Sequence, residues 1–158
     1  MNTKAISPVI ATVIIVSVAI AIAVAVAFWM TGITGLFTRY EKLEVISAYA
    51  VYDDTNIAPG NDNIDGGWNI TVIVKNTGSS DATVDNIFIN GKPFTVYGND
   101  VLINGSSTLS ESTITPGQRA VFVITLSDDV QDFSHGVIVE VKLHTAAGNE
   151  YPKSVQLP

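Results

Sequence analysis

A run of 34 residues without a charge, from Ala5 to Thr38, constrains this chain more than any other feature. Its central part, Val9 to Met30, has 22 residues, of which only Thr12 and Ser17 are polar. As an α-helix with a rise of about 1.5 Å per residue, this part reaches about 33 Å, enough to cross a hydrocarbon core of about 30 Å. The sequence therefore predicts one helix near the N-terminus that is able to span a membrane.

The start of this helix is marked by local signals. Ser7 suits the N-cap because its hydroxyl accepts a hydrogen bond from a free amide, and Pro8 suits the first helical position because its missing N–H costs nothing there. We predict a hydrophobic helix over residues 6–42 and a second domain over residues 43–158.

Small residues repeat inside the predicted helix. From Val18 to Ala27 a β-branched residue alternates with alanine. Wound as a helix, the alanines form two rows spaced by four on nearly opposite faces: Ala19, Ala23 and Ala27, and Ala21 and Ala25. Such rows let helices approach closely in a membrane, so they favour a helix with neighbours on several sides. The alternative is a membrane helix of ordinary composition.

The residues alone leave three interpretations of the N-terminus open. A secretory signal peptide would use Lys4 as its charged region, Val9 to Ile22 as its apolar region and Ala25-Val26-Ala27 as its cleavage site. An uncleaved membrane anchor is the second interpretation. The third follows from a family resemblance.

The string Lys4-Ala5-Ile6-Ser7-Pro8-Val9-Ile10, directly before the apolar run, resembles the start of an archaeal type IV pilin. In that family a prepilin peptidase cuts after a small residue that follows a basic one. Here this implies a leader of residues 1–5, processed at Lys4, Ala5 and Ile6, with the cut between Ala5 and Ile6. The bacterial pattern has a glutamate at the fifth mature position, where this chain has Ile10; archaeal pilins with a Ser-Pro-Val-Ile start generally lack that acid.

The resemblance, which covers roughly residues 4 to 40, implies a structural role and no enzyme activity. The helices of many identical chains would bundle into the core of an adhesive filament, with the second domains outside. The implied partners are the chain itself, the prepilin peptidase and the pilus assembly machinery of membrane platform and ATPase, with the membrane as the site of the precursor. The residues expected to pack in the filament core are Pro8, Ala19, Ala21, Ala23, Ala25, Ala27 and Phe28.

Charge predicts where the second domain resides. Lys4 favours the cytoplasmic side before processing, and the chain from Val45 onward has 13 acidic and 5 basic residues, a net charge of −8. An acidic domain of this kind belongs outside the cell, and nucleic-acid binding is not expected because no basic patch is present. The chain has no cysteine, which excludes disulfides and thiolate metal sites.

The second domain has the pattern of an all-β fold. Segments such as Trp68 to Lys75 and Ala120 to Leu126 are rich in β-branched residues, and Asn90-Gly91 is a strong hairpin signal that predicts pairing of Ala82 to Ile89 with Pro93 to Tyr97. Regular turn signals predict an immunoglobulin-like sandwich of seven to eight strands. With the helix this makes an α+β lollipop, and the short join without a flexible spacer favours a filament subunit over a tethered enzyme.

The second domain shows no sequence signal of catalysis or of a cofactor. His135 and His144 lack metal-ligand spacing, and neither a Gly-x-Ser-x-Gly elbow nor a phosphate loop is found. Asp53-Asp54 and Asp128-Asp129 are interpreted as turn carboxylates. We therefore expect neither catalysis nor a cofactor.

Two further surface motifs occur in the second domain. The loop Asn61-Asp62-Asn63-Ile64-Asp65-Gly66 has oxygen side chains at the spacing of a calcium loop, but Val72 replaces the glutamate needed at its twelfth position, so a plain turn is favoured and no metal is expected. Asn69 and Asn104 each begin an N-glycosylation triplet. Asn104 is the stronger candidate acceptor because it lies in a predicted loop, whereas Asn69 lies near the start of a predicted strand.

Two alternative functions stay open at this point. One is an extracellular binding protein held at the membrane by the helix, which would recognise a ligand with its β-domain. The other is an archaellin, the subunit of a motility filament. The length of the apolar run and the absent linker favour a filament over the first, and the Ser-Pro-Val-Ile start favours a pilin over the second.

Overall fold

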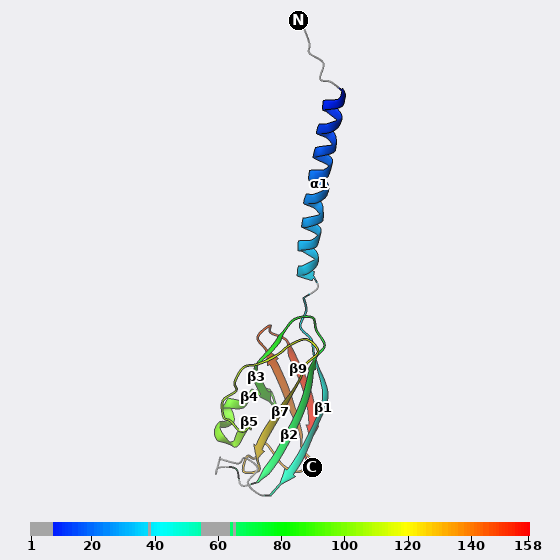
Figure 1. Ribbon diagram of the computed structural model, residues 1–158. Helices are drawn as coiled ribbons and strands as arrows, with labels where there is room; N and C mark the ends of the chain where they lie inside the picture. The colour runs from blue at the N-terminus through cyan, green and yellow to red at the C-terminus, as the bar shows by residue number, and fades with distance from the viewer. Residues whose placement is uncertain (1–7, 38, 55–63, 65) are drawn as a thin grey trace. The chain divides into compact units, whose positions relative to one another are not determined.

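The chain consists of two compact units, Met1–Arg39 and Tyr40–Pro158, in a computed structural model that describes residues 8–37, 39–54, 64 and 66–158 (Figure 1). The first unit holds one helix, α1, over Pro8–Phe37. It begins at Pro8, where a fixed φ and a missing N–H suit the first turn. The second unit is all-β, which confirms the predicted fold class of one long apolar helix followed by a β-sandwich.

Nine antiparallel strands lie within the described part of the second unit, which we call the head. Seven to eight were expected; the three-residue strands β5 and β6 are too short to show an alternating pattern in the sequence. The strands are β1 (Leu43–Asp53), β2 (Gly67–Asn76), β3 (Ala82–Ile89), β4 (Lys92–Pro93), β5 (Val101–Ile103), β6 (Ser112–Ile114), β7 (Arg119–Ser127), β8 (Ile138–Thr145) and β9 (Glu150–Gln156).

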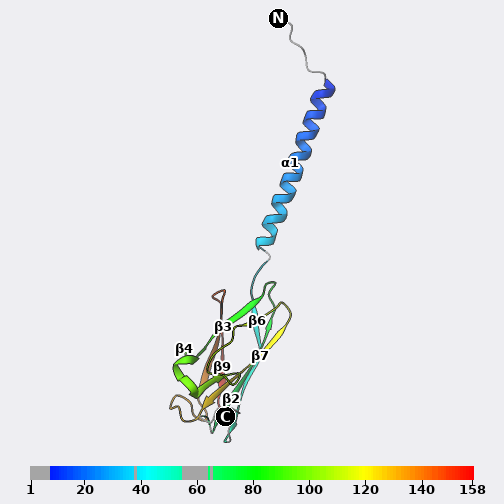
Figure 2. The same ribbon diagram turned by 60° about the vertical axis from the view of Figure 1, so that its left-hand side comes forward.

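The strands form two sheets that pack face to face (Figure 2). Sheet 1 has the order β1-β2-β7-β5, and sheet 2 has the order β4-β3-β8-β9, with β6 paired to the same edge of β3 as β4. The connection from β2 to β3 passes from one sheet to the other. The connections from β5 to β6, from β6 to β7 and from β7 to β8 do the same. Pairing partners distant in sequence, such as β2 with β7, therefore define both sheets.

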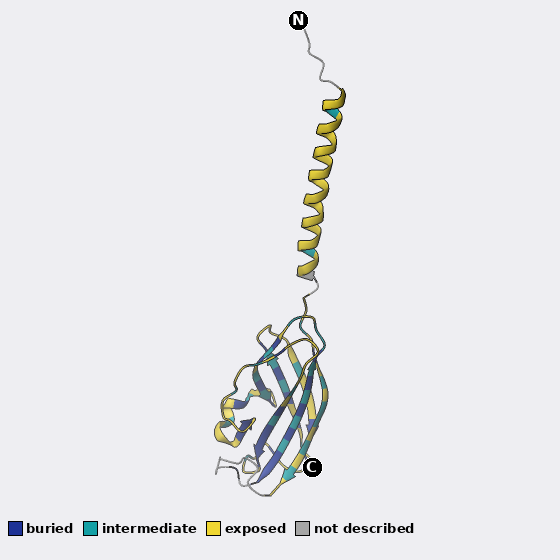
Figure 3. Cartoon of the chain, viewed as in Figure 1, coloured by how far each residue is buried: buried dark blue, intermediate teal, exposed yellow. Residues whose placement is uncertain are grey.

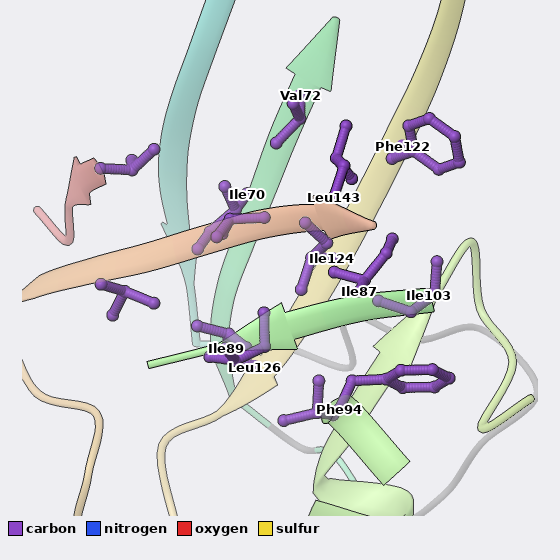
Figure 4. Close-up of a cluster of buried hydrophobic side chains, with 14 of the residues drawn as sticks. Ile70, Val72, Ile87, Ile89, Phe94, Ile103, Phe122, Ile124, Leu126 and Leu143 are labelled. Carbon is purple, nitrogen blue, oxygen red and sulfur yellow. The ribbon is translucent and has the colours of Figure 1, made fainter. Parts of the chain in front are cut away.

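The inner faces of the two sheets share one apolar core (Figure 4). From Trp68 onward every second residue of β2 is buried, which is the two-residue period of a strand with one covered face. Facing side chains from both sheets interdigitate there, and each fully buried Val, Leu, Ile or Phe stabilises the fold by about 1.5–3 kcal/mol. The labelled members of this core are Ile70, Val72, Ile87, Ile89, Phe94, Ile103, Phe122, Ile124, Leu126 and Leu143.

The hairpin predicted at Asn90-Gly91 is right at its turn and wrong beyond it. Both turn residues have positive φ, 50° and 77°, as a tight turn requires. Only Lys92–Pro93 then pairs with β3, and Phe94–Asp100 forms a 3₁₀ helix, η1, in place of the predicted strand. Pro93 cannot donate a ladder hydrogen bond, and the turn into η1 buries Phe94 in the core.

A short neck, Tyr40–Lys42, joins the head before β1. The Lys42 carbonyl accepts hydrogen bonds from the amides of Thr77 and Gly78, and the Tyr40 carbonyl accepts them from the amides of Ser79 and Ser80, at 2.8–3.2 Å. A Cβ atom on Gly78 would lie 2.5 Å from the Tyr40 carbonyl oxygen, so only glycine permits this approach. The neck is therefore fixed to the β2–β3 turn and belongs to the head.

Candidate functional site

The most unusual surface of the described chain is helix α1 itself. From Pro8 to Gly35 none of its residues is buried, and Phe28 is 76% exposed (Figure 3). It is long and apolar enough to cross a membrane. A helix that is apolar on all sides is stable only where lipid or other protein covers it. This helix is therefore the candidate functional element of the described chain.

The polar side chains of α1 suit an apolar environment. Each of its four hydroxyls donates a hydrogen bond to a carbonyl of the preceding turn, so none needs water. An unpaired hydroxyl in an apolar medium would cost several kcal/mol. The bonds are Thr12 to Val9 at 2.9 Å, Ser17 to Val13 at 2.8 Å, Thr31 to Ala27 at 2.8 Å and Thr34 to Met30 at 2.8 Å.

The residues predicted to pack in a filament core all lie on α1, and all of them are exposed. With 3.6 residues per turn, the rows that begin at Ala19 and at Ala21 run along different sides of the helix. Their role stays a prediction, because a single chain contains no neighbouring helix. The predicted processing residues Lys4, Ala5 and Ile6 lie outside the described residues.

Trp29, next to the predicted packing residue Phe28 on α1, was missed in the sequence. Phe28 and Trp29 are both exposed, and Trp29 lies about 32 Å along the helix from Pro8 at about 1.5 Å per residue. Tryptophan concentrates at membrane–water interfaces. Trp29 lies about one bilayer thickness from the start of the helix. The length of the apolar run would have been enough to predict this position from the sequence.

The two glycosylation candidates differ in their surroundings. Asn104 lies in an exposed turn with φ of 51°, and its Oδ1 accepts a hydrogen bond of 2.9 Å from the Val123 amide. Asn69 lies within β2, between β1 and β7, and its Oδ1 accepts a hydrogen bond of 2.7 Å from the Thr125 hydroxyl. A transferase reaches an exposed turn more readily than the middle of a sheet, which favours Asn104.

Both histidines have ordinary partners. His144 Nδ1 lies 2.6 Å from Asp85 Oδ1. His135 Nδ1 contacts the Pro158 carbonyl oxygen, and its ring packs against Tyr52 and Trp68 with centroids 4.6 and 5.3 Å apart. These contacts account for each ring as a structural element of the head.

The carboxylate of Asp128 in the head also has a structural partner. The Tyr52 hydroxyl donates a hydrogen bond of 3.2 Å to Asp128, and the pKa of Tyr52 is raised by desolvation and by that carboxylate. Among the residues that the structure describes, no group of three or more potential metal ligands is found. Asn61, Asn63 and Asp65 of the weighed calcium loop lie outside them, and Val72 is a core residue.

Comparisons with known proteins bear on the fold at most. No family model matches the sequence, and a search of curated proteins finds no match. Among solved structures, the chain is similar to the apo PCuAC domain from PmoF1, with 13% identity, 75% of this chain and 98% of that chain covered, and a TM-score of 0.47. It is also similar to the Iho670 flagellar-like filament, with 16% identity, coverage of 96% and 98%, and a TM-score of 0.39.

A third solved structure is the archaeal flagellum of Methanospirillum hungatei strain JF1. Its identity to this chain is 16%, 94% of this chain and 88% of that chain are covered, and the TM-score is 0.47. At such identities and TM-scores none of the three matches carries an argument about activity or assembly. The assignment of function rests on the residues of the chain itself.

Proposed function

We propose that this chain is the structural subunit of an archaeal type IV pilus that serves surface adhesion. The observation that carries the proposal is helix α1, which is 30 residues long, apolar on all sides and exposed, with every hydroxyl bonded to its own backbone. An acidic head with its own core is attached to it. Such a helix suits two environments in turn, the lipid bilayer and a bundle of identical helices.

Processing connects the two environments. In the membrane, α1 spans the bilayer with the head outside, and Lys4 holds the N-terminus on the cytoplasmic side. A prepilin peptidase cuts between Ala5 and Ile6, which removes that charge. The assembly machinery of membrane platform and ATPase then moves the helix from lipid into the growing filament. The mature protein resides on the cell surface as a homopolymer.

Packing through small residues drives the association. Within lipid there is no hydrophobic gain from helix contact, so the alanine rows on α1 contribute by close approach. Once the helices leave the bilayer, burial of their apolar surface stabilises the bundle by about 25 cal/mol per Å². A contact between two different surfaces, repeated along a screw axis, yields a filament because it does not close into a ring.

The test combines electron microscopy of the cell surface with a mass spectrum of the sheared protein. The proposal expects filaments whose subunit begins at Ile6. A subunit that begins at Phe28 would mean ordinary secretion with no helix left for a core, and the proposal would be wrong. An intact chain from Met1 in the membrane fraction, without filaments, would instead identify an anchored binding protein.

The same filaments decide between adhesion and motility. An adhesive pilus requires that deletion of the gene reduces attachment to surfaces while swimming persists. Loss of swimming with normal attachment would identify an archaellin. The peptide mass of the sheared protein also tests modification, and we expect a glycan on Asn104 and an unmodified Asn69, because Asn69 lies between two neighbouring strands.

A further inference from the structure

The outer face of sheet 1 is uncharged at its centre, next to a charged row of Glu44, Lys75 and Arg119. Three cross-strand rows on this face connect β1, β2 and β7, and none of their members is charged. The rows are Ser47, Ile73 and Val121; Tyr49, Thr71 and Val123; and Val51, Asn69 and Thr125, the last continued by Leu102 of β5. We call this surface the sheet 1 face.

Large apolar side chains on this surface are exposed. Tyr49 is 48% exposed, Val51 is 54% exposed and Val121 is 51% exposed. They are three of the seven large apolar side chains that the described part of the head leaves exposed, and a fourth, Ile46, lies in the β1 bulge beside them. Exposed apolar side chains gathered on one face of a sheet favour an interaction site there.

One end of the same surface already has an apolar cover. Leu102 is buried together with Ile64, in a small cluster separate from the main core. Ile64 comes from the segment between β1 and β2. The head itself thus covers the end at Leu102 and leaves the part around Tyr49 and Val121 open.

The outer face of sheet 2 has the opposite character. Lys142 forms an ion pair of 2.9 Å with Glu150, and His144 lies 2.6 Å from Asp85. Glu140 lies on the same face of β8, because its position alternates with the buried Val139 and Val141. This face is suited to water, and a chain with net charge −7 repels its own copies wherever acidic surfaces meet.

We propose that the sheet 1 face packs against helix α1 of a neighbouring copy, so that sheet 1 faces the helical core and sheet 2 faces the solvent. This inference rests on the proposed filament. Helices at the outside of a bundle still have an uncovered apolar side, and α1 carries no charge that the face would have to neutralise. A filament contact joins two different surfaces, and neither of these two carries a charge.

The dimensions fit one helix and exclude a free dimer. Strands about 4.8 Å apart and rows about 6.6 Å apart give the face roughly 300 Å². Its width of about 14–20 Å accommodates a helix of about 10–12 Å diameter. A stable interface buries about 800 Å² per partner, so this contact adds to an assembly held by the helices and does not create one alone.

Cross-linking in assembled filaments tests the contact directly. The chain has no cysteine, so Tyr49→Cys places a single thiol on the face for a benzophenone label, and Ile138→Cys is the matched control on the outer face of sheet 2, where Ile138 is 64% exposed. Illumination of labelled filaments is expected to give a product of twice the subunit mass from Tyr49→Cys, joined to a peptide from residues 8–37. Ile138→Cys is expected to give none.

Two outcomes would overturn the inference alone: intact filaments in which Tyr49→Cys links only to head peptides or to nothing, or equal linkage from both positions. If the unlabelled chain forms no filaments at all, the proposed function fails and the inference fails with it. As a second variant, Val121→Lys is expected to give fewer and less stable filaments than Ile138→Lys. As a control for folding, the heads of the Val121→Lys and Ile138→Lys variants must show the same circular dichroism in detergent. Normal filaments from Val121→Lys would contradict the proposed contact.

Discussion

Helix α1 and strand β2 are both rich in apolar residues, yet one exposes them and the other buries them. In β2 the apolar residues alternate with half-exposed ones, and the alternate set enters a core shared by two sheets. In α1 the apolar residues occupy all sides, and none is buried from Pro8 to Gly35. The difference shows that the arrangement of apolar residues decides whether a segment can bury them within its own chain. The two-residue alternation of β2 allows this, and the apolar residues on all sides of α1 do not. The head completes its core alone, and α1 needs lipid or other copies.

The largest expected effect comes from placing a charge where α1 needs an apolar neighbour. Val16→Asp, within the apolar part of the helix, costs up to about 2.5–3.5 kcal/mol per subunit in a membrane, and the cost recurs at every copy in a filament. We expect no filaments by electron microscopy and an unchanged β-signal of the head in detergent, and the same result from Ala23→Glu. Ser154→Asp, exposed on β9, is the control. Normal filaments from Val16→Asp would remove α1 as the assembly element.

The reverse change damages the head and spares the helix. Phe122→Ala in β7 removes a buried ring and is expected to lower the free energy of unfolding by about 3–5 kcal/mol. Its neighbour Val121 points to the opposite face and is exposed, so Val121→Ala should change that free energy little. Thermal melting of the β-signal in detergent measures both. Equal losses from the two variants would contradict the assignment of inner and outer faces.

A smaller effect is expected at the neck. Gly78→Ala brings a Cβ atom to 2.5 Å from the Tyr40 oxygen and 2.7 Å from the Lys42 nitrogen, both backbone atoms with little freedom. We expect a loss of about 1–3 kcal/mol in head stability and faster hydrogen exchange at the amides of the β2–β3 turn. Gly32→Ala, which meets nothing within 4 Å, should leave the head unchanged. Unaltered exchange in Gly78→Ala would mean that the neck is not fixed there.

The smallest expected effect is a dependence of head stability on alkaline pH. The pKa of Tyr151 is raised above 10.0, chiefly because partial burial disfavours the phenolate, and Glu41 adds to the effect. A raised folded-state pKa means that the stability due to the neutral phenol is fully present below pH 10.0 and is lost as the pH rises through the folded value. Tyr151→Phe should therefore lose less stability between neutral and alkaline pH than the parent chain. Parallel curves would contradict the assignment.

Several parts of the fold followed from local sequence. The uncharged run and Pro8 predicted α1, and the β-branched segments predicted the longer strands, because both patterns act through neighbours in the chain. Asn90-Gly91 predicted its turn for the same reason. The pairing expected for Phe94 was wrong, because burial in a core built from distant strands prevailed over extension of a hairpin.

The candidate functional surfaces also differ in whether the sequence could predict them. The apolar surface of α1 was predictable by inspection, since a helix without charge is apolar on every side whatever its tertiary contacts. The sheet 1 face was not predictable, because Tyr49, Thr71 and Val123 are far apart in sequence and meet only through the register of three strands. A single apolar residue on each of three strands does not predict a shared surface, because the surface depends on how the strands pair.

The sequence by itself determined that this chain has one apolar helix and an acidic β-head, because charge and period are local properties. Only the tertiary structure decided that the centre of the outer face of sheet 1 is uncharged and that of sheet 2 charged, that the neck is fixed at Gly78, and that Ile64 covers Leu102. The physical reason is that strand order and register bring together residues from distant segments, and the energy of those contacts exists only once the sheets have formed.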